Sequence, residues 1–262
     1  MSDINSIISS LQKINEDKIQ EITLPYSKVD ITLKPFQAKH NSMVNSSLVA
    51  GGDGTYALKF SSLLKDIFDD LIIIKNGKTY LDIPLIDVHD IVLRIRKTFS
   101  NTVSIDIGTE EEQTIDINDI ISKFENTETK ITEGVCEDKS KQIKIYIKQP
   151  SFLVNLEYDK IITASHKKFG DKNSEIMIKD ALAYTVLKFI QKMDITVENE
   201  IQTIFMNTIS PKDRITLLNS IDNIMYKDLM DKVSELTNPI DDLLKVDGEY
   251  SLAMDQRILM DN

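Results

Sequence analysis

The sequence predicts an α+β protein, and three observations support this fold class. Apolar and polar residues alternate around a proline-containing turn in Glu21–Phe36, which is typical of a β-hairpin. Gln142–Lys148 alternates in the same way and predicts another strand. From about residue 173 the apolar spacing becomes helical. We therefore expect an N-terminal helix and a β-hairpin with further helices over 1–100, a small β-rich region over 101–170 and a C-terminal helical bundle over 171–262.

An amphipathic helix is expected near the N-terminus, over residues 4 to 19. Its apolar positions share one helical face and are Ile4, Ile7, Ile8, Leu11 and Ile14. This face can pack on the core of the chain or dock on a neighbouring protein. The sequence leaves both alternatives open.

Further elements are expected on both sides of the β-rich region. Helical apolar spacing and helix-end signals predict early helices over Ala38–Ala50, Thr55–Ile74 and Pro84–Lys97. The β-rich region is expected to hold a hairpin of Thr102–Ile107 and Thr114–Ile117, a short helical piece around Ile120–Phe124, and a strand over Phe152–Leu156. The C-terminal helices are expected over Ser174–Met193, Glu198–Ile209, Pro211–Ile221 and Met225–Leu236. Ser210 is the expected N-cap of the third.

Composition narrows the classes of function. The net charge is −11 and the pI is about 4.8, which opposes broad contact with nucleic acid or with anionic lipid. No apolar run approaches the length of about 20 residues that a membrane-spanning helix needs. The lone Cys136 excludes an internal disulfide, and the chain begins with no secretory leader. We therefore expect a protein of a reducing cytoplasm, with no nucleic-acid or membrane partner.

Motifs for catalysis are sparse. His40, His89 and His166 lie far apart in the sequence, without the spacing of metal ligands. Glu133, Glu137 and Asp138 surround Cys136 with negative charge, which raises a thiol pKa and makes it a poor nucleophile. No nucleotide-binding or serine-hydrolase motif is present. We therefore expect neither catalysis nor a bound cofactor or metal.

Two short stretches carry a resemblance to a known family. EITLPYSKVDITLKPF contains an LP…KPF hairpin, and DIPLIDVHDIVLRIRKT contains an LPL-hydrophobic-D segment followed by an LRxR-like helix end. In this order and helical setting they resemble the baseplate hub proteins of T-even-type contractile-tailed bacteriophages. The matching positions are Leu24, Pro25, Lys34, Pro35, Phe36, Pro84, Leu85, Asp87, Leu93, Arg94 and Arg96. The segment Phe205–Val233 is similar to the late helical pair of the family, although less closely.

The resemblance implies a structural or assembly component of the phage tail baseplate hub. Such a protein has no catalytic role, contacts other tail and baseplate proteins, and is made in the host cytoplasm, from where it can enter the virion baseplate. Some family members carry cysteine pairs suited to zinc, but this chain has one cysteine, so a zinc site is not carried over. Two alternatives remain open, namely a hydrolase with an unrecognised site and a cytoplasmic regulatory binding domain.

Seven of the matching positions are the candidate interaction residues: Leu24, Pro25, Lys34, Pro35, Phe36, Arg94 and Arg96. Phe36 is expected to be a buried anchor that fixes the hairpin to the helix Thr55–Ile74. For Arg94 and Arg96, complementarity with the helix end and a contact with a carboxylate are both open. That carboxylate can belong to another subunit or to this chain.

Overall fold

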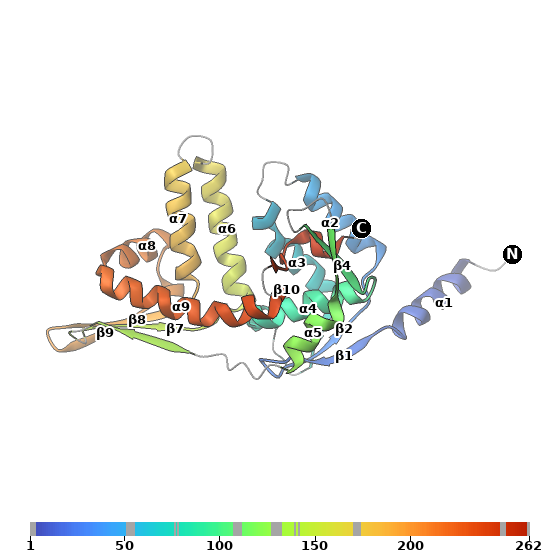
Figure 1. Cartoon of the computed structure of the whole chain (residues 1–262), viewed down its shortest axis with the longest axis horizontal. Coiled ribbons are helices and arrows are strands. Elements are labelled where there is room, and N and C mark those ends of the chain that lie inside the picture. Colours follow the sequence, from blue (N-terminus) through green and yellow to red (C-terminus); the bar gives the residue numbers. More distant parts are fainter. Residues whose placement is uncertain are drawn as a thin grey trace. The chain divides into compact units, whose positions relative to one another are not determined.

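The computed structural model describes residues 4–50, 56–75, 77, 79–106, 112–126, 133–138, 140, 142–169, 174–246 and 250–260 (Figure 1). The α+β fold class is confirmed, since helices and small antiparallel sheets make up these residues. The chain divides into two compact units. Unit 1 comprises Met1–Thr127 and Leu244–Asn262, and unit 2 comprises Glu128–Leu243. These bounds differ from the three sequence regions because the C-terminal segment belongs with the N-terminal half.

Unit 1 begins with helix α1 and a three-stranded sheet. Its elements are α1 Ile4–Glu16, β1 Gln20–Thr23, β2 Asp30–Leu33, α2 Ala38–Ala50, α3 Tyr56–Leu71, β3 Ile72–Ile74, α4 Leu85–Lys97, β4 Thr102–Asp106, β5 Glu112–Asp116, α5 Ile117–Asn126, β10 Lys245–Val246 and β11 Tyr250–Ser251. Short 3-10 helices lie at Tyr80–Asp82 and Gln256–Leu259. Strand β2 pairs with β1 on one side and with β3 on the other. The predicted hairpin at Glu21–Phe36 and the pairing of β4 with β5 are confirmed.

The core of unit 1 is built on α3 and α4. Ile67 and Phe68 of α3 and Ile91 and Leu93 of α4 are completely buried, together with Leu33 of the sheet. The predicted helix Thr55–Ile74 is wrong at its end, because Ile72–Ile74 is strand β3. Three consecutive β-branched residues fit an extended strand better than a helix, and all three pair with residues of β2.

Unit 2 contains a four-stranded antiparallel sheet and four helices among its described residues. Its elements are β6 Gly134–Glu137, β7 Ile143–Ile147, α6 Phe152–Phe169, α7 Ser174–Leu187, β8 Ile190–Val197, β9 Glu200–Phe205, a 3-10 helix at Met206–Thr208, α8 Pro211–Ser220 and α9 Asn223–Leu244. The strand order is β6-β7-β8-β9. Buried residues of the sheet and helices, such as Ile145, Met193 and Leu229, form one core. Ser210 caps α8 as predicted, with its Oγ accepting from the Asp213 N–H.

Two predicted helices in unit 2 are wrong in whole or in part. The sequence predicts a helix over Ser174–Met193, but α7 ends at Leu187 and β8 follows. It also predicts a helix over Glu198–Ile209, where the chain forms strand β9. Glu198 and Asn199 have φ values of 52° and 70°, which is the conformation of a two-residue hairpin turn. This turn lacks the usual glycine, so the sequence does not reveal the hairpin.

The predicted strand over Phe152–Leu156 is also wrong, because this segment is the first part of helix α6. Phe152 and Leu156 are buried while Leu153 between them is exposed, which is a spacing of four residues on one helical face. The Ser151 Oγ accepts from the N–H of Val154 at 3.4 Å at the start of the helix. A short apolar run does not distinguish a strand from the beginning of a helix.

Helix α9 continues past the predicted end at Leu236 and includes Pro239. Proline removes one backbone N–H from the helix and normally favours its termination. Here the buried side chains of Ile240 and Leu243 continue the apolar face beyond the proline. The side chain of Gln149 also donates a hydrogen bond to the Leu236 carbonyl. Burial of the apolar face therefore outweighs the local effect of proline.

Candidate functional site

A buried carboxylate joins the two sequence motifs in unit 1. Asp87, in the first turn of α4, is completely buried and accepts hydrogen bonds from the backbone N–H groups of Tyr26 and Ser27 at 3.0 and 2.8 Å. These donors lie in the turn between β1 and β2. Burial raises the pKa of the Asp87 carboxyl, whereas the hydrogen bonds from Ser27 and Tyr26 favour its charged form. Asp87 therefore fixes the start of α4 against the tip of the hairpin.

The candidate residues of the hairpin lie around this contact. Leu24 is completely buried, and its carbonyl accepts from the Lys28 N–H at 3.1 Å, where Lys28 has a φ of 55°. Pro25 is half-buried and Pro35 is buried. Lys34 pairs its backbone N–H with the Leu71 carbonyl at 2.9 Å, and its Nζ donates to the Asp70 carbonyl at 3.2 Å. The hairpin exit is therefore held by the end of α3.

Phe36 is half-buried, so the prediction that its side chain is buried is wrong. Its ring stacks on Phe99 with centroids 4.9 Å apart, and it lies 5.1 Å from the ring of His40. Phe99 follows the end of α4, whereas the expected partner was the helix over Thr55–Ile74. The link to α3 runs through His40, whose Nε2 is 2.7 Å from Asp70 Oδ2. We therefore expect Phe36→Ala to cost less than the removal of a fully buried ring.

Arg94 forms ion pairs within unit 1. Its Nε donates to Asp90 Oδ2 at 2.8 Å and its Nη2 donates to Glu125 Oε1 of α5 at 2.9 Å. Asp90 is completely buried, and burial raises its pKa to about 6 although the Arg94 guanidinium opposes the shift. The contact of Arg94 with a carboxylate therefore involves this chain, and it links α4 to α5.

Arg96 is the largest fully buried side chain of the described residues, with 2% exposed. Its Nε and Nη2 donate to the Thr102 carbonyl at 3.2 and 2.9 Å, and its Nη1 donates to the Met260 carbonyl. The guanidinium carbon lies 4.9 Å from the centroid of the Phe99 ring. Arg96 therefore holds the C-terminal segment and the start of β4 against the end of α4.

The candidate interaction residues thus differ in how much of their surface is exposed. Leu24, Pro35 and Arg96 are buried within unit 1, so they maintain its fold and the prediction that they contact a partner needs correction. Pro25, Lys34, Phe36 and Arg94 retain some exposed surface. For these four, contact with another protein stays a prediction.

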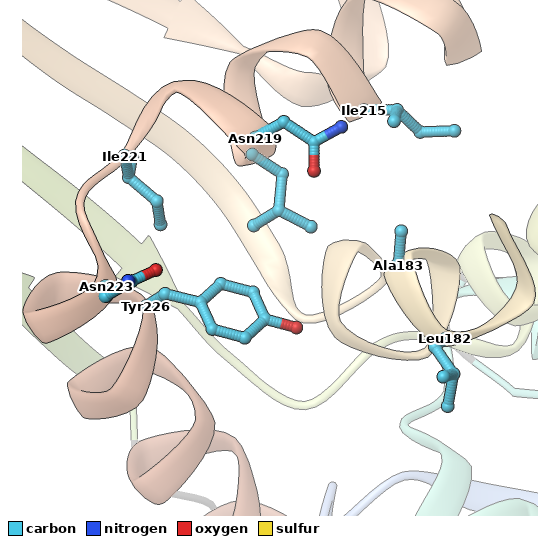
Figure 2. Close-up of a pocket in the computed structure, with 8 residues that line it drawn as sticks. Leu182, Ala183, Ile215, Asn219, Ile221, Asn223 and Tyr226 are labelled. Carbon is cyan, nitrogen blue, oxygen red and sulfur yellow. The ribbon is translucent and has the colours of Figure 1, made fainter. Parts of the chain in front are cut away.

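A groove between α7, α8 and α9 was not predicted from the sequence. Its volume is about 310 Å³, and it is lined by Leu182, Ala183, Ile215, Leu218, Asn219, Ile221, Asn223 and Tyr226. Leu218 is buried, and Leu182 is 61% exposed. Figure 2 shows the ring of Tyr226 projecting from α9 toward α7. None of the eight lining residues carries a charge, and six have apolar or aromatic side chains, so this groove suits an apolar ligand.

Groups for catalysis or metal binding are sparse in the described part of the chain. Cys136 is buried, and burial, with Asp228 nearby, raises the pKa of its thiol to about 12. The described residues include no cluster of three or more His, Cys, Asp or Glu side chains placed to hold a metal ion. Among the described helices, none has the length and apolar character needed to cross a membrane.

Comparisons of the chain with protein-family models, with curated proteins and with solved structures found no match.

Replacement of Asp87 tests the link between the two motifs. Asp87→Ala leaves the N–H groups of Tyr26 and Ser27 without their acceptor, and we expect a loss of about 2–3 kcal/mol in the free energy of unfolding. Chemical denaturation measures the loss, and hydrogen exchange should show faster exchange at Tyr26 and Ser27. Asp82→Ala, at an exposed position before α4, is the control. A loss below about 0.5 kcal/mol, typical of an ordinary surface substitution, would contradict this role of Asp87.

Replacement of Arg96 tests how the C-terminal segment is held. Arg96→Lys keeps the charge but loses the planar guanidinium that reaches both Thr102 and Met260. We expect several-fold faster trypsin cleavage after the exposed Arg257, followed by mass spectrometry of the shortened chain. Lys97→Ala changes an exposed cation on the same helix and should leave the cleavage rate unchanged. Equal rates in the Arg96→Lys and unaltered proteins would show that another contact holds the segment.

The stability of unit 1 should depend on the protonation of His40. Its Nδ1 accepts from the Gln37 N–H at 2.9 Å, so the neutral ring donates from Nε2 to Asp70. Burial lowers the pKa of His40 from its ordinary value of 6.5, although Asp70 acts in the opposite direction. The unfolded chain therefore takes up a proton at a higher pH than the folded chain, and stability is lost as the pH falls below 6.5.

We expect His40→Gln to reduce the difference in thermal midpoint between about pH 7.5 and about pH 5.5, the range in which a histidine titrates. Other groups such as Asp90 also titrate near this range. The measurement therefore compares the pH dependence of the thermal midpoint in the His40→Gln protein with that in the unaltered protein. Parallel profiles for the His40→Gln and unaltered proteins would assign the pH dependence to those other groups.

Proposed function

We propose that this chain is a structural or assembly component of a contractile phage tail baseplate hub, which acts through protein–protein contacts. The two motifs that resemble the hub family support this proposal. Asp87 of the second motif accepts hydrogen bonds from Tyr26 and Ser27 of the first, which precede it by 61 and 60 residues. One hydrogen-bonded contact therefore joins the two motifs within unit 1.

Uncharged apolar surfaces also favour a protein partner. The groove between α7, α8 and α9 is apolar, and α1 exposes Ile4, Ile7, Ile8 and Ile14. Exposed apolar patches of this kind are typical of protein–protein contacts. The net charge of −11 opposes nucleic acid and anionic membranes as partners.

The proposal is tested in the phage that encodes the chain. If the gene is inactivated, tails should fail to assemble and baseplate intermediates should accumulate in the host cytoplasm. Expression of the intact chain in the same host should restore infectious particles. Mass spectrometry of purified virions and of the intermediates then shows whether the chain stays in the tail or leaves after assembly. Normal particle yield without the gene would contradict the proposal.

A further inference from the structure

The apolar face of α1 is exposed to solvent. Every α1 side chain that the structure describes is exposed except Asn15, which is half-buried. The exposed fractions are 71% for Ile4, 47% for both Ile7 and Ile8, and 52% for Ile14. Their spacing places these isoleucines on one face of the helix. This arrangement favours docking on a neighbour over packing on the core of the same unit, the two alternatives that the sequence leaves open.

The length of α1 limits what it can bind. Its 13 residues are fewer than two heptads, whereas a coiled coil needs about three or four. A short amphipathic helix with anchors at positions i, i+3 and i+4 is instead the typical ligand of an apolar groove. The groove between α7, α8 and α9 has about 310 Å³ for such anchors and an apolar floor at Leu218.

The chain itself carries both an uncharged apolar helix face and an uncharged groove. Two copies that each carry −11 repel one another over most of their surfaces. The α1 residues from Ile4 to Gln12 are uncharged, and so are all eight residues that line the groove. These two surfaces can therefore approach each other without charge repulsion and without leaving a buried charge unpaired.

We propose that α1 of one copy docks its isoleucine face into the α7–α8–α9 groove of a second copy. This contact deepens the proposed function by naming a second copy as one partner. It joins two different surfaces, so association of more than two copies produces a closed ring or an open chain. The test below measures association of the purified protein alone, so it can fail while the assembly role stands.

Two full-length variants separate the helix from the groove. Ile7→Glu with Ile8→Glu places charges on the apolar face of α1, and Leu182→Glu with Tyr226→Glu places charges at the groove. All four positions are at least 36% exposed, so we expect both variants to fold. The controls are Ser9→Glu, on the opposite face of α1, and Ile224→Glu, which is 64% exposed on α9 but does not line the groove. Circular dichroism and thermal midpoints confirm that each variant is folded.

Sedimentation velocity over a range of concentrations measures the association. We expect the unaltered protein and both controls to associate, and each variant to associate about tenfold or more weakly when alone. An equal mixture of the two variants keeps one intact helix face and one intact groove on different chains. It should therefore form a complex of two chains that grows no further.

Each other outcome overturns the proposal. A monomeric unaltered protein would show that a second copy is not the partner, as expected if α1 docks within its own chain or on another protein. Association that is lost only in the helix variant would indicate that α1 docks elsewhere, for example on another α1. Association that is lost only in the groove variant would assign the groove to another segment. Two monomeric variants that fail to associate when mixed would show that the two surfaces do not meet.

Discussion

The buried carboxylate of Asp87 accepts two backbone N–H groups from the tip of the β1–β2 hairpin, and the arrangement of unit 1 follows from this contact. A buried carboxylate is costly unless its oxygens are hydrogen-bonded, so α4 can bury Asp87 only if the turn is in place. Within this turn Lys28 adopts the left-handed conformation. The strand that follows, β2, pairs with β3 at the end of α3. One polar contact thus couples the first strands, α3 and α4.

The two arginines extend this coupling to the rest of unit 1. Arg94 joins α4 to α5 through Glu125, and Arg96 joins α4 to the C-terminal segment through Met260. Buried charges of this kind stabilise a fold only when their partners are present, and removal of one partner leaves the other uncompensated. Arg96 and Met260 are 164 residues apart in the sequence, and their contact, together with the burial of Ile258 and Leu259, joins the C-terminal segment to unit 1.

Local patterns predicted those parts of the structure that local forces determine. The amphipathic helices α1, α3 and α4, the hairpin at Glu21–Phe36 and the Ser210 cap all have signals within a few neighbouring residues. Strand β9 was missed because Glu198 and Asn199 adopt a hairpin turn without glycine, and β3 was missed because its pairing with β2 is a tertiary contact. The groove was missed for the same reason, since Leu182, Ile215 and Tyr226 come from three helices whose packing no local pattern specifies. The sequence singled out the arginine motif, but burial of Arg96 by the C-terminal segment is a long-range effect that no local pattern reveals.

The distribution of polar and apolar groups also separates stability from recognition. In unit 1 the buried side chains of Asp87 and Arg96 form hydrogen bonds with backbone groups of the same unit, and the motif residues Leu24 and Pro35 are buried as well. The uncharged apolar surfaces lie elsewhere, on α1 and in the groove of unit 2. Apolar surface favours binding because its burial removes it from water. In a protein with a large negative charge, this burial meets the least charge repulsion where the surface itself is uncharged. The buried motif residues Leu24, Pro35 and Arg96 therefore build the fold, whereas α1 and the groove, which carry no motif, expose the uncharged apolar surface that suits a partner.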